Sequence, residues 1–196
     1  MDQVIPNQFN GFSRIEYLSV FVALLYGFVV AEFFLGWSKM FRKREQILFS
    51  YEHIAWTTIF FFVIVLNYYT MWFRISYLEM GFFYYLLVFV PILIFYFAAI
   101  YLFPEFDGIN ELDLKSYFIK SNKSIIALMS LYFTLNLIIS TVFHENEVFA
   151  TVNIIRFLYV VFGMAAFLHN VLWLRLLLLA YMSVALVVAL VVASGS

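Results

Sequence analysis

Six long apolar stretches leave this chain few ways to fold. They cover residues 16–37, 47–73, 82–103, 124–143, 148–168 and 171–192. A helix needs about 20 apolar residues to cross the roughly 30 Å hydrocarbon core of a bilayer, and each stretch is about that length or longer. Inside a bilayer only helices and closed barrels satisfy every backbone N–H and C=O group. We therefore predict an all-α integral membrane protein, a bundle of six transmembrane helices forming a single domain over residues 1–196.

Composition excludes several classes of protein. Of the 196 residues, 66% are hydrophobic and only 12% are charged, whereas a soluble domain has about 25% charged residues. The net charge of −1 provides no basic footprint for nucleic acid, so we expect no nucleic-acid partner. The chain has no cysteine, so it can form neither a disulfide nor a thiolate metal site.

The last two apolar stretches run together. Residues 148–192 are nearly all apolar, and the clearest polar break is His169-Asn170, followed by Arg175. Such a run is too long for one crossing of the bilayer. We therefore predict a tight helical hairpin at this break.

The distribution of Lys and Arg predicts the orientation in the membrane. The first, third and fifth connections hold eight basic residues and the opposite side holds two, Arg14 and Arg74. Cytoplasmic connections are enriched in basic residues, so both termini should be non-cytoplasmic. The eight are Lys39, Arg42, Lys43, Arg44, Lys115, Lys120, Lys123 and Arg175.

The third connection has room for extra structure. Apolar and charged residues alternate over 105–123, including Leu114 and Phe118 among Lys115 and Lys120. This pattern favours a short amphipathic helix on the cytoplasmic leaflet. A solvated loop with some apolar contacts is the alternative.

Small residues recur along the first stretch. Ser19, Ala23, Gly27 and Ala31 are spaced four apart. Membrane helices approach closely where side chains are small. We therefore expect this stripe to make the first helix a packing hub of the bundle.

Ionisable residues in or near the spans define a predicted inner polar cluster. Insertion of one charged group into the bilayer centre costs about 2.5–3.5 kcal/mol, so each needs a partner. The predicted topology places five residues at one depth: Glu32, Glu52, His53, His169 and Arg175. One interpretation is a proton- or ion-responsive site; the other is a structural pair of Glu32 with Arg175 or His53 that fixes helix register.

A predicted outer polar cluster lies toward the opposite face of the membrane. It contains Arg156 with Asn153 one turn away, level with Asn67 and Asn136. Asparagine side chains and helix carbonyls can satisfy a guanidinium that reaches toward the interface. A structural role is the first interpretation, and contact with an anion or lipid headgroup is the second.

No sequence pattern indicates catalysis, a cofactor or a metal. The chain has no nucleophile elbow, zinc-protease, phosphate-loop or dinucleotide motif. The predicted topology puts one of the three histidines on the opposite side of the membrane, which argues against a three-histidine zinc site. We expect no enzymatic activity and no cofactor.

Several short segments resemble a family of small uncharacterised bacterial multi-pass membrane proteins. They are EYLSVFVALLYGFVVAEFFLGW with a basic turn after it, YEHIAW at the start of the second stretch, LFPE after the third, and DLKSYFIKSNKSIIAL before the fourth. The resemblance implies a bacterial inner-membrane protein and carries no known activity or site residue.

Three functions fit these features. The first is a membrane-embedded sensor, partner subunit or oligomeric module, in contact with membrane lipid and with a second copy or a membrane or cytoplasmic partner. The second is a homo-oligomeric ion or small-solute channel using the inner polar cluster. A secondary transporter ranks behind both, because only Pro91 breaks a span near its middle and no internal repeat is present.

Overall fold

The computed structural model describes residues 14–71, 82–105, 111–142, 148–169 and 171–194. These residues form six helices, which confirms the predicted all-α class. Three of the helices contain spans long and apolar enough to cross a membrane: Glu16–Arg42, Tyr51–Met71 and Leu114–Thr141. The helices are α1 (Arg14–Arg42), α2 (Tyr51–Met71), α3 (Phe82–Leu102), α4 (Leu114–Val142), α5 (Val148–His169) and α6 (Leu172–Ser194).

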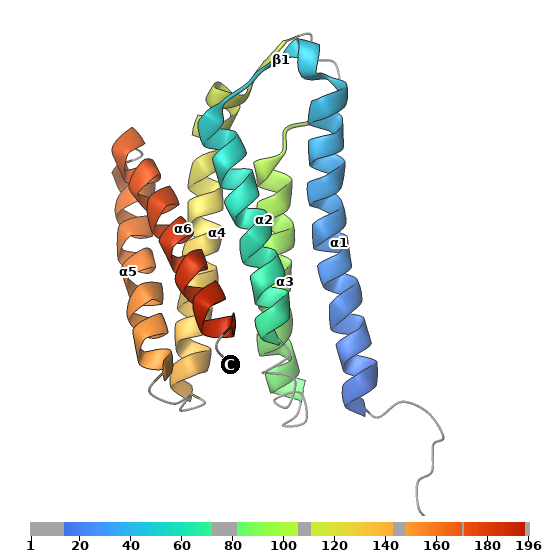
Figure 1. Cartoon of the computed structure of the whole chain (residues 1–196), viewed down its shortest axis with the longest axis vertical. Coiled ribbons are helices and arrows are strands. Elements are labelled where there is room, and N and C mark those ends of the chain that lie inside the picture. Colours follow the sequence, from blue (N-terminus) through green and yellow to red (C-terminus); the bar gives the residue numbers. More distant parts are fainter. Residues whose placement is uncertain (1–13, 72–81, 106–110, 143–147, 170, 195–196) are drawn as a thin grey trace, which may run out of the picture.

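Successive helices run in alternate directions along the bundle (Figure 1). α4 packs against α3 and α5, α2 packs against α6, and α1 packs against α3 and α2. The end of α1 and the starts of α2, α4 and α6 lie at the upper end in Figure 1, which we call the basic end. The start of α1 and the end of α6 lie at the opposite end.

The second helix begins later than predicted. Its predicted range began at residue 47, but Ile47–Leu48 form a short strand, β1, after a 3-10 turn at Arg44–Gln46. β1 pairs in parallel with β2 (Leu112–Asp113). α2 then begins after Ser50, a residue type preferred before the first helical turn, whose carbonyl accepts from the Ile54 amide at 3.1 Å. The apolar run therefore contains a strand as well as a helix.

The prediction of a separate amphipathic helix in the third connection is wrong. Residues 114–123 are the first turns of α4, which continues without a break for 29 residues. Asp113 caps this helix, accepting from the Lys115 amide at 2.9 Å and from the Ser116 hydroxyl at 2.6 Å. No glycine or proline follows within 114–142 to end the helix early. The solvated-loop alternative fails over these residues for the same reason.

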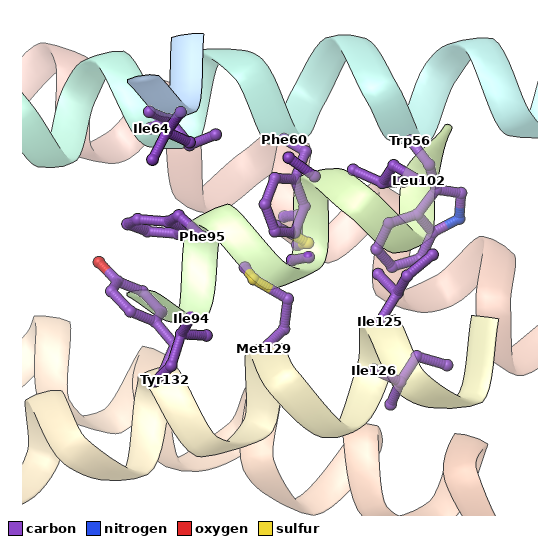
Figure 2. Packing of buried hydrophobic residues seen from close by; sticks show 14 of the residues in the cluster. Trp56, Phe60, Ile64, Ile94, Phe95, Leu102, Ile125, Ile126, Met129 and Tyr132 are labelled. Atoms are coloured by element: carbon purple, nitrogen blue, oxygen red, sulfur yellow. The ribbon is translucent and has the colours of Figure 1, made fainter. Parts of the chain in front are cut away.

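Aromatic side chains fill the core between α1, α2, α3 and α4. Phe60 lies edge-on to Phe95 with ring centroids 5.9 Å apart, and it stacks with Phe33 at 6.1 Å. Figure 2 shows Trp56, Phe60 and Ile64 of α2 facing Phe95 of α3 and Met129 of α4. Close-packed interiors leave few voids larger than a water molecule. This part of the bundle is therefore held by apolar contact rather than arranged around a polar path.

Contrary to the prediction, the small-residue stripe of α1 does not form a continuous packed face inside the bundle. Gly27 and Ala31 are exposed, and a Cβ built on Gly27 meets nothing within 4 Å. The packed face carries Val22, Val29 and Phe33 instead. A spacing of four residues advances about 40° around a helix at each step. Four such residues therefore wind away from the core rather than facing one neighbour.

The close approach of α1 to the bundle occurs at a glycine outside that stripe. A Cβ on Gly36 would lie 2.2 Å from Cγ of Phe103, the residue that follows α3. Phe103 also lies edge-on to Phe33, with centroids 5.3 Å apart. The absence of a side chain at Gly36 therefore lets Phe103 fill the space beside α1.

Candidate functional site

An ion pair joins α2 to α6 near the basic end. Arg175 Nε donates to Glu52 Oε1 at 2.7 Å, and Nη2 donates to Oε2 at 3.3 Å. The side chains are 5% and 11% exposed respectively. A forked guanidinium matches a carboxylate in this way. Two of the five residues of the predicted inner cluster therefore meet directly, across 123 positions of sequence.

His53 follows Glu52 in sequence but faces different helices. It is fully buried, and its Nε2 lies 2.7 Å from the Leu102 carbonyl at the end of α3. Its ring lies edge-on to Tyr117 and Phe118 of α4. Consecutive helical residues point about 100° apart. Glu52 can therefore pair with α6 while His53 binds the end of α3.

Tyr117 of α4 also binds backbone carbonyl groups at the end of α3. The Tyr117 hydroxyl lies 3.0 Å from both the Tyr101 and the Phe103 carbonyl oxygens. The last carbonyls of a helix lack partners within the helix itself. His53 Nε2 donates to one of three successive carbonyls, and the single Tyr117 O–H proton is shared between the other two. These contacts fasten three helices together at the basic end.

The predicted pairing of Glu32 with Arg175 or His53 is wrong. Arg175 pairs with Glu52, and the Nε2 of His53 bonds the Leu102 carbonyl. Glu32 is half-buried on α1, and within the described ranges it makes no hydrogen bond or ion pair. His169 is exposed at the end of α5. The five residues therefore form one pair and three separate side chains, because shared depth does not make side chains face one another.

Part of the predicted outer cluster links α1, α2 and α4. The Tyr26 hydroxyl donates to Asn67 Oδ1, and Asn67 Nδ2 donates to the Tyr132 hydroxyl. Tyr132 also lies against Phe95, with centroids 4.7 Å apart. The two tyrosines were not predicted, since they were counted only as apolar residues. Tyr26 lies one turn after Val22 on the same face of α1. This spacing could have identified Tyr26 as a buried residue.

The rest of the outer cluster links α4 to α5. Arg156 Nη1 donates to Asn153 Oδ1 at 2.9 Å and lies 3.5 Å from the Asn136 carbonyl. Asn153 Nδ2 donates to the Ser140 hydroxyl at 2.9 Å. Asn136 Nδ2 donates to the Tyr132 carbonyl at 2.9 Å. Tyr132 of α4 therefore takes part in both groups, through its hydroxyl in the first and its backbone carbonyl in the second, and the two groups together join four helices.

These contacts fix helices relative to one another. Asn67, Asn136 and Asn153 each bind protein groups, and Arg175 lies against a carboxylate. Within the described ranges, no group of three or more His, Asp or Glu side chains could hold a metal ion. The arrangement of these polar contacts is suited to fixing the register and packing of the helices.

Among the residues with described side chains, most of the exposed cations lie at the basic end. Lys39, Arg42 and Arg44 are exposed around the end of α1, and Lys115 and Lys120 are exposed on the first turns of α4. Lys123 lies over the Phe167 ring, 5.8 Å from its centroid. The two-stranded pair of β1 and β2 spans this end between them (Figure 1).

Asp113 at the same end is held ionised. Its pKa lies below the usual value because the Ser116 hydroxyl and the Lys115 amide donate to its carboxylate. A hydrogen bond to the charged form of a carboxyl favours that form. The α4 cap is therefore a carboxylate at neutral pH.

Comparison with protein-family models, with curated proteins and with solved structures finds no match for this chain.

Proposed function

We propose that this chain is a subunit of a membrane assembly in the bacterial inner membrane. In this proposal all six helices cross the bilayer, the basic end faces the cytoplasm and both termini face away from it. The outer face of α1 provides the lateral contact, with a second copy of the chain as its occupant. The protein has a structural or sensory role in the assembly, and it catalyses no reaction.

The exposed small-residue face of α1 is the observation that carries the proposal. Gly27 and Ala31 lie on the outside, and the hydrophobic window of α1 is the least buried of the three long apolar helices. Helices in lipid associate by close packing, which small residues permit. The exposed half of the stripe, at Gly27 and Ala31, is therefore suited to a contact outside the bundle.

Glu32 lies beside this surface, about 100° around α1 from Ala31. It is half-buried, and within the described ranges it has no ionic or hydrogen-bonding partner. A carboxylate within the hydrocarbon region is costly unless it is paired, hydrated or protonated. A neighbouring copy against α1 would remove part of that side chain from lipid.

Self-association in lipid nanodiscs or proteoliposomes tests this proposal. Labelled copies are mixed and energy transfer is measured against dilution of the protein in lipid. Ala31→Leu should weaken association at least fivefold, because the added side chain prevents close approach. Ala180→Leu is the matched control, since Ala180 is exposed on α6. Association that is undetectable in the wild type, or equal in the two variants, contradicts the proposal.

A homo-oligomeric channel is the second candidate, and Glu32 is the observation that favours it. In an assembly built around α1, several copies of this half-buried carboxyl would lie near one another. Ion flux into liposomes is then measured for the wild type and for Glu32→Gln. A channel requires flux that depends on Glu32; absence of flux from the wild type favours the non-conducting subunit.

A further inference from the structure

A short segment at the basic end combines exposed cations with exposed apolar side chains. It runs from residue 39 to residue 51, through the end of α1, the 3-10 turn and β1, to the start of α2 (Figure 1). We call it the ledge. Met40 and Ile47 of the ledge are buried, but its other apolar side chains are exposed: Phe41 at 71%, Leu48 at 64%, Phe49 at 52% and Tyr51 at 93%.

The charge on the ledge is strongly one-sided. By sequence it contains Lys39, Arg42, Lys43 and Arg44 against a single acidic residue, Glu45. Arg42 and Arg44 are exposed, and within the described ranges neither forms an ion pair. Basic residues near a helix end interact favourably with its dipole. That explanation suits Arg42 in the last turn of α1 but not Arg44, which follows the helix.

The other long connection at the same end differs in charge. Residues 105–123 hold four acidic and three basic side chains by sequence. Asp113 accepts from the α4 backbone, and Lys123 lies over the Phe167 ring. The excess positive charge of this end is therefore concentrated on the ledge.

We propose that the ledge lies in the membrane interface and that Arg42, Lys43 and Arg44 bind the phosphate of an anionic phospholipid. The exposed aromatic side chains enter the region between headgroups and acyl chains, where aromatic residues are favoured. The guanidinium groups contact the phosphate oxygens, which they fit in a forked geometry. Apolar exposure beside the cations selects lipid over a soluble acidic protein, because a lipid covers both kinds of surface. This site does not depend on self-association through α1.

The expected size of the effect follows from membrane electrostatics. One Lys or Arg near an anionic surface contributes about 1 kcal/mol, or roughly a fivefold preference. Three such residues would give about a hundredfold preference if their contributions added in full, so we expect at least a tenfold preference for anionic over zwitterionic lipid at low salt. Higher ionic strength should reduce the preference, since exposed charges are screened.

Native mass spectrometry of the full-length protein in detergent tests the site. Apparent dissociation constants are measured for phosphatidylglycerol and for phosphatidylcholine with the same acyl chains. The wild type should bind phosphatidylglycerol at least tenfold more tightly. The triple variant R42Q/K43Q/R44Q should bring the two constants within about threefold of each other. The control K115Q/K120Q/K123Q removes the same charge from the same end and should keep most of the preference.

Several results would overturn the proposal. The first is a wild type that binds both lipids equally. The second is an equal loss of lipid preference in the ledge variant and in the control. The third is a lipid preference that does not change with salt concentration. Binding of polyglutamate that needs the ledge cations, without any lipid preference, would assign them to an acidic protein partner instead. Helix content by circular dichroism checks that both triple variants are folded.

Discussion

Arg175→Met should be among the most destabilising substitutions of a charged residue in this chain. The change removes the partner of Glu52, whose side chain is 11% exposed, from an ion pair with atoms 2.7 Å apart. At that distance the attraction is about 6 kcal/mol with an effective dielectric constant near 20. Desolvation offsets much of this gain while the pair is intact. Removing one partner leaves a buried charge uncompensated, at a cost of about 3–5 kcal/mol.

A set of three variants, compared with the wild type, tests this reasoning. Unfolding by SDS in mixed micelles is followed by far-ultraviolet circular dichroism. Arg175→Met should lower the free energy of unfolding by about 3–5 kcal/mol, whereas adding Glu52→Gln should recover most of it. Lys120→Met, at an exposed cation, should change it by less than about 0.5 kcal/mol. A small effect of Arg175→Met, or a double variant as unstable as the single one, would refute the burial argument.

Three further predictions follow from other contacts. Gly36→Ala should destabilise the fold by about 1–3 kcal/mol, because its Cβ would lie 2.2 Å from Phe103; Gly27→Ala, in open space, should not destabilise it, as the same SDS titration can show. Asn67→Ala should cost about 1–2 kcal/mol, since it removes two side-chain hydrogen bonds; a cost no greater than that of Ala180→Leu would contradict this. Because the pKa of Asp113 lies below its usual 3.8, the α4 cap stabilises the fold above that pH and is lost as pH falls through the folded pKa. Melting temperatures from roughly pH 5 to pH 2 should therefore fall less steeply for Asp113→Ala than for the wild type.

The positions of α3 and α5 could be predicted from the sequence because they depend on local apolar length, whereas α1 runs past its predicted end at 37 and α4 begins before its predicted start at 124. Helices α3 and α5 were predicted to within one residue at each end, and the break at His169 separates α5 from α6 as expected. The start of α2 was missed because Ile47–Leu48 are as apolar as the helix that follows. Apolar length alone cannot distinguish a short strand from an extra helical turn.

The partners of the polar side chains could be predicted only in part. Topology gives each residue a depth, but it does not give the rotation of its helix. Glu32 and Glu52 were placed at one depth, and only the fold shows that Glu52 meets Arg175. Asn136, Asn153 and Arg156 were grouped by spacing and depth, with two of them one turn apart in the fifth span and the third at the same level, and the structure brings the three together.

The small-residue stripe shows the same difficulty. Its spacing of four residues suggests a single face, although it turns steadily around the helix. The glycine that meets the bundle, Gly36, lies outside it. That contact depends on Phe103, a residue 67 positions away, so no local pattern could reveal it.

Topology in the membrane tests the central claim most directly, and a chain without cysteine is suited to it. Gln46→Cys places a thiol at the exposed basic end, and Ser194→Cys places one at the last residue of α6. Each variant is labelled in intact bacterial cells with a membrane-impermeant maleimide. The proposal predicts labelling at position 194 and protection at position 46 until the membrane is permeabilised. Labelling at position 46 in intact cells with protection at 194, or equal labelling at both, would contradict it.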